Sequence, residues 1–386
     1  MTPFAFNTTP SVIFEGGSSR RLADIAGAKL GPRVLFVTDP GLRRLGLCDP
    51  ALSALAAAGV TLTVFDAVEA DPSRSTLMLA VQAARSASVT GVIGFGGGSS
   101  LDVAKLAALL AGSDEDLDAA WGVGNAKGPR LPLVLVPTTA GTGSEVTPVS
   151  IITVGEEEKR GVSSPVILPD MAVLDPELTL GLPPAITAAT GVDAMVHAIE
   201  AYASKNANNN PLSKTLARQA LRLLGANIEK AVFSGADIEA RGAMLLGSML
   251  AGQAFANAPV AAVHALAYPI GGTFHVPHGL SNALVLPHVL RFNAPDAAHL
   301  YAEIAADAFP ALSREPGVQG RCAAFIEELA DLSQRIGLQT RLRDVGIGEE
   351  HVPKLAADAM KQTRLLVNNP RTVTETDAAA IYRAAL

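Results

Sequence analysis

The first half of the chain alternates short apolar runs with segments of helical spacing. Four runs are apolar on both faces of an extended strand: Val34–Thr38, Thr61–Phe65, Gly91–Phe95 and Leu131–Pro137. Strands of this kind are typical of parallel sheets that are covered by helices on both sides. Alanine-rich helical segments, Ala51–Ala58 and Ser75–Ser86, lie between the runs. The pattern predicts an α/β domain with a parallel sheet built from βαβ units.

The second half of the chain has a different pattern. After the turn sequence at residues 181–184 (GLPP), strand-like runs nearly disappear and long segments show helical spacing. Within Thr187–Ser204, apolar residues recur every three or four positions, which places them on one face of a helix. We therefore predict two domains, an α/β domain at residues 1–180 and an all-helical domain at residues 181–386.

Composition narrows the class of protein. The chain has 386 residues, of which 49% are hydrophobic and 17% charged, so it can bury large cores. Its net charge of -7, without a basic block, argues against nucleic acid as a partner. Two distant cysteines, Cys48 and Cys322, indicate neither a disulfide framework nor a zinc ribbon. The uncharged stretch from Gly242 to Phe274 is broken by polar residues and prolines, so we expect buried helices, no membrane partner and a cytoplasmic protein.

A glycine loop follows the third apolar run. Gly94-Phe95-Gly96-Gly97-Gly98-Ser99-Ser100 lies between this run and the helical segment Leu101–Leu110. Glycines allow backbone N–H groups to approach a phosphate, and a helix N-terminus adds partial positive charge. The loop is no Walker A motif, and it departs from G-x-G-x-x-G because Ser99 takes the last place. Strand–loop–helix context favours phosphate binding over a simple tight turn.

A polar loop and a single acidic residue follow two other apolar runs, at the carboxyl ends of the strands, where parallel sheets bind ligands. The first, residues 137–145 (PTTAGTGSE), carries hydroxyls and glycines that can contact a phosphate or a nicotinamide amide. The second is Asp39, which can accept hydrogen bonds from adenosine ribose hydroxyls. Its alternative role is to open the Asp-Pro-Gly turn.

All seven histidines lie in the second half, and three fall between residues 264 and 278. Asp193 and His197 are four residues apart, which places both side chains on one face of a helix. Together with His264 and His278 they offer one carboxylate and three imidazoles, a set that suits a divalent transition metal. Each histidine by itself is better interpreted as a hydrogen-bonded core residue, so the metal interpretation depends on the four residues together.

Seven motifs together resemble the iron-containing, or group III, alcohol dehydrogenase family, in that family's order and spacing. They are GGGSSLDVAK (96–105), PTTAGTGSEVT (137–147), LPDMAVLDPEL (168–178), ATGVDAMVHAIEAYAS (189–204), AGQAFANA (251–258), HALAYPIGG (264–272) and VPHGLSNALVLPHV (276–289). The resemblance runs nearly from end to end.

The resemblance implies an NAD-binding α/β domain, a helical metal-binding domain and an active site in the cleft between them. It assigns the metal ligands to Asp193, His197, His264 and His278, with Fe2+ expected and Zn2+ as the alternative. It also implies NAD as cofactor and a homodimer. The implied cofactor-binding residues are Asp39, Gly96, Gly97, Gly98, Ser99, Asp102, Thr138, Thr139, Thr142, Ser144 and Lys159, the last of these by a loose alignment.

One position departs from many family members. Where they carry a second histidine, four residues after the third ligand, this chain has Tyr268. A phenol is a poorer base than an imidazole near neutral pH, so either Tyr268 or His275 is expected to relay the proton. Val149, Phe255, Tyr268 and Phe274 are candidates for the substrate pocket, although core packing explains Val149 and Phe274 equally well.

These expectations describe reversible hydride transfer between NAD(H) and a small alcohol, aldehyde or ketone. Alternatives of the same fold are a maleylacetate reductase, a zinc-dependent glycerol dehydrogenase and a hydroxyacid–oxoacid transhydrogenase. A dehydroquinate synthase-like lyase belongs to another class, and it calls for more basic residues near the histidines than the sequence offers. A non-catalytic NAD-binding protein is the remaining alternative.

Overall fold

The structure is a computed structural model that describes residues 3–155 and 158–386. The chain divides into two compact units. The α/β unit comprises Asn7–Thr139 and Gly143–Leu180. The helical unit comprises Gly181–Leu386, the short segment Ala140–Thr142 and the described residues of Met1–Phe6. The main division therefore falls after Leu180, and two short segments from the first half of the chain group with the second unit.

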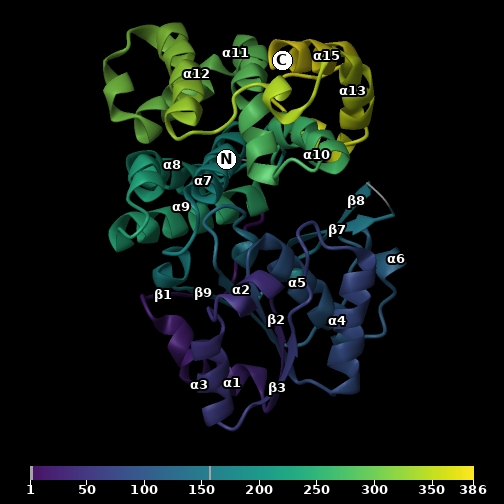
Figure 1. The fold of residues 1–386 in the computed structure, drawn as a ribbon. Coiled ribbons are helices and arrows are strands. Elements are labelled where there is room, and N and C mark those ends of the chain that lie inside the picture. The colour runs from purple at the N-terminus through teal and green to yellow at the C-terminus, as the bar shows by residue number, and fades with distance from the viewer. Residues whose placement is uncertain (1–2, 156–157) are drawn as a thin grey trace. The chain divides into compact units, whose positions relative to one another are not determined.

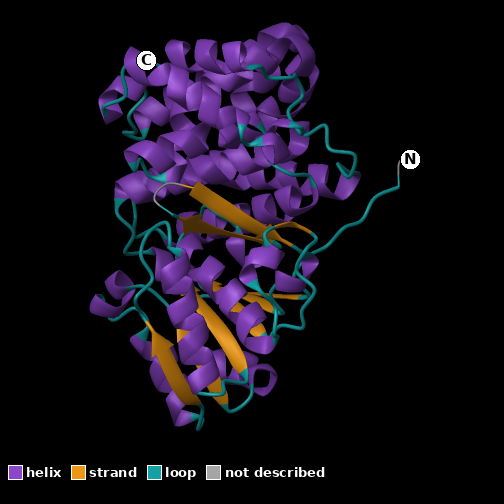
Figure 2. Cartoon of the chain, turned by 90° about the vertical axis from the view of Figure 1, so that its right-hand side faces the viewer, coloured by secondary structure: helices purple, strands orange, loops and turns teal. Residues whose placement is uncertain are grey.

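A six-stranded parallel sheet forms the centre of the α/β unit (Figures 1 and 2). Its strands are β1 Ser11–Phe14, β2 Arg33–Val37, β3 Thr61–Phe65, β4 Gly91–Gly96, β6 Leu133–Pro137 and β9 Met171–Leu174. Their order across the sheet is β1-β9-β6-β4-β2-β3, so β4 and β6 are neighbours. The four strands expected from apolar runs are present, and the predicted α/β fold with a parallel sheet is confirmed.

Helices cover both faces of this sheet, and alternate strand residues pack into two separate cores. In β2, Val34 and Phe36 belong to one core, whereas Leu35 and Val37 belong to the other. The helices of the unit are α1 Leu22–Leu30, α2 Pro40–Arg44, α3 Asp49–Ala57, α4 Arg74–Ser86, α5 Gly98–Gly112 and α6 Leu117–Ala120. Burial on both faces explains why the strands lack polar alternation. The edge strand β3 differs, since its Val64 is exposed.

A second, three-stranded sheet of the α/β unit has no counterpart in the sequence prediction. It consists of β5 Gly122–Val123, β7 Val149–Val154 and β8 Glu158–Ser163, in the order β5-β8-β7. Strands β7 and β8 form an antiparallel pair, and β5 pairs with β8 in parallel. The residues of β8 are mostly polar, so they give no apolar run for a sequence pattern to detect.

Every regular element from Gly181 to Leu386 is a helix, as the sequence pattern predicts (Figure 1). These helices are α7 Pro184–Ala203, α8 Pro211–Phe233, α9 Ile238–Asn257, α10 Ala262–Phe274, α11 His278–Ala308, α12 Gly317–Arg335, α13 Val352–Met360, α14 Thr363–Leu366 and α15 Glu375–Ala384, with short 3-10 turns among them. Helices α7, α8 and α9 pack against one another, and α11 packs along α7, α10 and α12. None of the helices in the described residues is long and apolar enough to cross a membrane.

Candidate active site

The glycine loop connects β4 to the N-terminus of α5. Gly96 has a φ of 153°, and a β-carbon there would lie 2.8 Å from Ser100 Oγ, so the turn requires glycine. Gly97 precedes the helix, and no side chain of the described residues caps it. Gly97, Gly98 and Ser99 remain partly exposed. The arrangement leaves backbone N–H groups of the first helical turn available to an anion, as expected for a phosphate-binding loop.

The second polar loop begins beside the glycine loop because β4 and β6 are neighbouring parallel strands. Thr138 N donates a hydrogen bond to Gly96 O at 3.0 Å, and Thr138 is buried. The side chain of Thr139 lies near the α-carbon of Gly97. Thr142 belongs to the segment Ala140–Thr142, which groups with the helical unit. Thr138 and Thr139 therefore share a sheet edge with the glycine loop.

Two charged residues expected at the cofactor already have partners in the α/β unit. Asp39 is the N-cap of α2, and its Oδ1 accepts hydrogen bonds from Gly41 N at 2.8 Å and Leu42 N at 3.0 Å. This is the turn-opening role that the sequence left open. Lys159, on β8, forms an ion pair with Asp71. Any contact of these side chains with a cofactor would have to coexist with those bonds.

A buried lysine ties α5 to the segment after β6. Lys105 Nζ donates to Ser144 Oγ at 2.8 Å, Thr147 Oγ1 at 3.2 Å and Val149 O at 2.6 Å, and it lies 3.5 Å from Asp102 Oδ1. Its side chain is fully buried. Burial lowers the pKa of Lys105, while the charge of Asp102 opposes this shift. We call Lys105, Asp102, Ser144 and Thr147 the buried lysine network.

Asp102 completes that network. Its Oδ1 accepts a hydrogen bond from Ser144 Oγ at 2.6 Å, and its Oδ2 accepts one from Ile151 N at 2.8 Å. The side chains of Asp102 and Ser144, both expected at the cofactor, thus contact each other and hold α5 against the segment that follows β6. Their observed contacts stabilise the shape of the glycine-loop region.

Glu145 is a second ionisable group buried beside the network. It is almost fully buried, and its Oε1 has no hydrogen-bond partner among the described residues. Burial raises the pKa of Glu145 to about 7, although the charge of Lys105 acts in the opposite direction. A carboxyl group in this environment changes charge near neutral pH.

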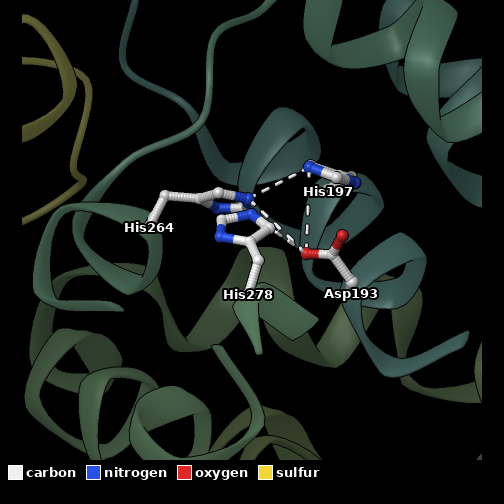
Figure 3. A group of neighbouring side chains, drawn as sticks. All are labelled: Asp193, His197, His264 and His278. Carbon is white, nitrogen blue, oxygen red and sulfur yellow. Dashed lines mark hydrogen bonds and ion pairs between the residues drawn. The ribbon is translucent and has the colours of Figure 1, made fainter. Parts of the chain in front are cut away.

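Three helices of the helical unit bring the candidate metal ligands together. Asp193 and His197 are one turn apart on α7, His264 lies in the first turn of α10, and His278 begins α11. We call these four residues the His/Asp cluster. Figure 3 shows their side chains converging from these separate elements. Their ligand atoms all lie within 4.8 Å of one another.

The distances in the His/Asp cluster suit one shared cation. Asp193 Oδ1 lies 4.0 Å from His197 Nε2, 3.8 Å from His264 Nε2 and 3.6 Å from His278 Nε2 (Figure 3). The Nε2 atoms of His197 and His264 are 3.0 Å apart. Donor atoms about 2.1 Å from one tetrahedral ion lie about 3.4 Å from each other. The donors therefore surround a point that an ion of this size fits.

Neighbouring groups fix which nitrogen of each imidazole carries the proton. His264 Nδ1 lies 2.7 Å from Glu200 Oε2, and the other Glu200 oxygen accepts a hydrogen bond from Val263 N at 2.7 Å. His197 Nδ1 lies 3.2 Å from Gly141 O. Carboxylate and carbonyl oxygens only accept hydrogen bonds, so both Nδ1 atoms must donate. In the neutral rings, both Nε2 atoms then carry lone pairs.

The Nε2 atoms of His197 and His264 lie 3.0 Å apart. Burial lowers the pKa of His197 to about 3, so its ring is neutral near pH 7. The donor set is one carboxylate and three imidazoles, two of which are held by a carboxylate and a carbonyl partner, and this is the donor set of a transition-metal site. The residues present thus fit a divalent metal.

Asp193 is ionised in this setting. Burial by itself would raise its pKa, but the charge of the three histidines when they are protonated and a hydrogen bond from Asn282 act against burial, and the pKa of Asp193 is lowered. Asn282 Nδ2 donates to Asp193 Oδ1 at 2.6 Å. The cluster therefore contains one buried negative charge and no buried positive charge from lysine or arginine among the contacts described for it.

A glycine sets the position of His278. A β-carbon at Gly279 would lie 2.3 Å from Ala189 O and 3.3 Å from Asp193 Cβ. Contacts this short do not occur for real side chains, so the first turn of α11 can approach α7 only because residue 279 has no side chain. The approach brings His278 to the carboxylate of Asp193.

The residues expected to relay a proton or line the substrate pocket occupy different positions. Tyr268 lies near the cluster, with its ring centroid 5.9 Å from that of His278. The guanidinium carbon of Arg364 lies over the Tyr268 ring, 6.0 Å from its centroid. Phe255 stacks on His197 at a centroid distance of 4.4 Å. His275 is exposed at the C-terminus of α10, with a left-handed φ of 54°.

Two other pocket candidates have contacts elsewhere. Phe274 packs edge-on against His351, at a centroid distance of 4.9 Å. Val149 begins β7 in the α/β unit, and its carbonyl accepts a hydrogen bond from Lys105. Within the helical unit, Tyr268 and Phe255 are therefore the candidates that the structure brings to the His/Asp cluster.

Both units match known protein-family patterns. Residues 9–176 match the iron-containing alcohol dehydrogenase pattern, and residues 187–386 match the C-terminal pattern of the Fe-containing alcohol dehydrogenase family. The chain belongs to the iron-containing alcohol dehydrogenase family. The resemblance drawn from the seven motifs is thereby confirmed, and so is the expectation that the chain is an enzyme, an oxidoreductase of the alcohol dehydrogenase type.

Similar proteins cover nearly the full length of this iron-containing alcohol dehydrogenase. Long-chain-alcohol dehydrogenase 1 of Geobacillus thermodenitrificans is 43% identical over 363 residues, which is 92% of this chain and 90% of that protein. A 1,3-propanediol dehydrogenase of Klebsiella pneumoniae is 38% identical over 361 residues, 92% of each chain. A crystal structure of a 1,3-propanediol oxidoreductase matches with a TM-score of 0.95 and 35% identity, covering 100% of both chains.

Several residues that shape the sites of this dehydrogenase escaped the sequence analysis. Glu200, which orients His264, lies on α7 one turn after His197, and Asn282 lies one turn after His278 on α11. Helical spacing from each histidine was the signal that points to both. Lys105 gave a weaker signal, because its partners other than Asp102 lie outside α5, and Glu145 gave none, because its Oε1 has no partner among the described residues.

Proposed function

We propose that this dehydrogenase transfers a hydride between NAD(H) and a small alcohol, aldehyde or ketone, with Fe2+ held by Asp193, His197, His264 and His278. The observation that carries the proposal is the convergence of one carboxylate oxygen and three imidazole nitrogens, which all lie within 4.8 Å of one another. Such a donor set suits a divalent transition metal. Zn2+ accepts the same donors, so it is the second candidate for the ion.

The protein's part in the chemistry is positioning. Glu200 and the carbonyl of Gly141 hold two imidazoles with their Nε2 atoms aimed at a common point, and Asn282 holds the carboxylate. A divalent ion bound there would supply Lewis acidity toward the substrate oxygen. In the oxidation direction, the C–H bond of the carbinol carbon breaks with its electron pair, which goes to the nicotinamide ring, and the hydroxyl proton leaves to the protein or water.

The cofactor-binding residues are proposed on the geometry of the α/β unit. The loop Gly96–Ser99 offers backbone N–H groups at the start of α5 for the pyrophosphate. Thr138, Thr139 and Thr142 are proposed for the nicotinamide side, since Thr138 and Thr139 begin at the same sheet edge. Asp39 has used Oδ1 as a helix cap, and its Oδ2 is the oxygen proposed for the adenosine ribose, which favours NAD over NADP.

The departing proton needs an acceptor, and Tyr268 and His275 are the two proposed. Tyr268 is supported by its ring contact with His278. His275 is supported by its exposure, since an exposed imidazole exchanges protons with solvent. Tyr268→Phe and His275→Ala variants, compared through the pH dependence of kcat, separate the two, because only loss of the true acceptor removes the corresponding ionisation.

The test of the proposed reaction is turnover with a panel of short alcohols and aldehydes, with NAD or NADP, before and after removal of metal by a chelator. We expect NAD-dependent turnover that disappears on chelation and returns with Fe2+ or Zn2+, together with one ion per chain by elemental analysis. Alcohol oxidation that ignores the chelator would refute the metal centre. Product formed without net change in NADH would favour a lyase instead.

A homodimer in the cytoplasm is also proposed. Both cysteines are buried and free of disulfide bonds, which supports a reducing compartment. The dimer is supported by family membership alone. Analytical ultracentrifugation of the purified chain and fractionation of the producing cells test the two statements separately, and a monomer or a secreted protein would overturn the respective one.

A further inference from the structure

Asn282 lies one turn after His278 on α11, and its side chain faces the His/Asp cluster. Its Nδ2 lies 2.6 Å from Asp193 Oδ1 and 3.3 Å from the Nε2 atoms of both His264 and His278. The residue is fully buried. The amide therefore contacts three of the four candidate metal ligands, which come from three different helices.

The orientation of this amide follows from its partner. Asn282 Nδ2 donates a hydrogen bond to Asp193 Oδ1 at 2.6 Å, and a carboxylate oxygen accepts hydrogen bonds. Asn282 must therefore turn its NH2 group toward the cluster. An amide does not titrate, so the donor is present at every pH at which the protein folds. The carboxylate is thus held from one side by a neutral, permanent donor.

The other end of the amide shows that the cluster, and not the core, determines its position. Asn282 Oδ1 is buried and has no hydrogen-bond partner among the described residues. An unpaired buried carbonyl oxygen costs about 1–3 kcal/mol. The hydrogen bonds recorded for the side chain all go to candidate metal ligands. An amide retained only for packing would have its carbonyl satisfied.

The same helix supplies a matched comparison. Asn293 is also a buried amide on α11, but its Nδ2 donates to Tyr301 Oη and Asn369 Oδ1, and its Oδ1 accepts from Asn369 Nδ2. Both ends of that amide are satisfied by Tyr301 and Asn369, neither of which is a candidate metal ligand. Asn293 therefore shows what a purely structural amide looks like in this fold.

We propose that Asn282 is a positioning residue that holds the carboxylate of Asp193 toward the bound metal and so slows release of the ion. The proposal rests on the metal centre described under the proposed function. A hydrogen bond to a ligating carboxylate keeps it in one orientation, and loss of such a partner typically weakens metal binding about 10–100-fold. Two pairs with the same helical spacing then surround the site, Asp193 with His197 on α7 and His278 with Asn282 on α11. Asn282 acts on the ion only through Asp193.

The experiment compares metal release from the native holoenzyme with release from Asn282→Leu, Asn282→Ala and Asn293→Leu variants. Leucine keeps the branched shape of asparagine, removes both polar atoms and is the larger side chain, so it leaves no cavity, whereas alanine checks that the result does not depend on the new side chain. Each chain is loaded with Co2+, and loss of the ion to a chelator is followed by absorbance. Unfolding temperatures of the loaded and metal-free forms are measured alongside.

We expect both Asn282 variants to release Co2+ about 10–100-fold faster than the native chain and to show an altered Co2+ absorption spectrum. Asn293→Leu should release it at the native rate, even though it lowers the unfolding temperature of both forms. Native release rates in both Asn282 variants would overturn the proposal while leaving the metal centre intact. Failure of the native chain itself to bind Co2+ would instead refute the metal centre, and the proposal with it.

Discussion

In the α/β unit, three of the charged side chains near the cofactor loops already have partners, whereas in the helical unit the donor atoms of the His/Asp cluster face one another. Asp39 caps a helix, Lys159 pairs with Asp71, and Asp102 bonds to Ser144. In contrast, the Nε2 atoms of His197 and His264 are 3.0 Å apart, and both lie within 4.0 Å of Asp193 Oδ1. Satisfied polar groups maintain the shape of a loop, and unsatisfied, converging ones indicate where a ligand binds.

The largest effect should follow from removing a ligand of the His/Asp cluster. Asp193→Asn and His264→Ala are expected to lose most of the bound metal and to lower kcat/KM by more than about 100-fold, since even changes to the partners of ligands cost about 10–100-fold. His299→Ala, an exposed histidine on α11, is the control and should keep both. Metal analysis and steady-state kinetics measure the result, and a metal-replete, active Asp193→Asn chain would contradict it.

The second prediction tests whether the buried lysine network stabilises the α/β unit. Lys105→Met leaves Asp102 without its buried cation, and loss of one partner of a buried pair costs about 3–5 kcal/mol in the free energy of unfolding. NAD affinity should fall as well, because α5 is no longer tied to the loop after β6. Metal content should not change. Urea unfolding and NADH fluorescence titration measure these effects.

The control for Lys105 is Lys230→Met, which removes an exposed ion pair with Asp237. Exposed pairs contribute about 0–1 kcal/mol, so this variant should unfold nearly like the native chain. If the two lysine variants were equally stable, the buried lysine network would not be the element that stabilises this region.

The third prediction concerns pH. The pKa of Glu145 is about 7 in the folded state against an ordinary 4.5, so the folded chain binds more protons between these values. The stability associated with the neutral carboxyl is complete below pH 4.5 and is lost as pH rises through 7. We expect the native chain to lose up to about 3 kcal/mol between pH 5 and pH 8 relative to Glu145→Gln.

Glu145→Gln keeps the shape of the side chain and cannot ionise, so it isolates this contribution. The lowered pKa of Lys105 acts in the opposite sense at higher pH, where the folded chain binds fewer protons. Urea unfolding of both chains at several pH values gives the difference. Parallel stability curves for the two chains would show that Glu145 does not titrate in this range.

The fourth prediction tests whether Glu200, in the helical unit, raises metal affinity by orienting His264. Glu200→Gln replaces the carboxylate that fixes the tautomer of His264, and we expect metal affinity to fall about 10–100-fold while the unfolding of the metal-free chain changes little. Competition with a chromophoric chelator measures the affinity. Glu303, an exposed residue that accepts a hydrogen bond from Tyr202, offers the comparison, since Glu303→Gln alters a hydrogen-bonded carboxylate that does not contact the cluster ligands.

The smallest effect is expected at Asp39. Asp39→Ala removes the N-cap of α2 and should lower the free energy of unfolding by about 1 kcal/mol. It should also reduce the preference for NAD over NADP if Oδ2 contacts the ribose. The ratio of kcat/KM values for the two cofactors decides this. A loss of stability with an unchanged ratio would leave Asp39 as a helix cap only.

The sequence predicted the elements whose pattern is local. Apolar runs predicted four strands of the large sheet because both faces of β2, β4 and β6 are buried. Strands β1 and β9 were missed because their apolar runs span only four residues or fewer, and the polar strand β8 was missed because it has no such run. The exposed Val64 in β3 shows the limit of the same rule, since an edge strand can carry an apolar run without being covered.

The candidate site divides in a similar way. Residue type and helical spacing sufficed to select the His/Asp cluster, and the structure brings its four members together. The contact between Asp102 and Ser144 could not be predicted from the sequence, because the two residues are 42 positions apart and meet only when β4 and β6 lie side by side. Glu145 was missed because its environment, rather than its neighbours in sequence, changes its pKa.

The absence of a side chain at Gly279 has a consequence for engineering this enzyme. A screen that varies only residues touching a substrate would pass over it, yet the smallest addition, a single methyl group, would push α11 away from Ala189 and carry His278 with it. Activity would then be lost although every coordinating residue remained in the sequence. Position 279 should therefore be kept as glycine in any library built on this scaffold.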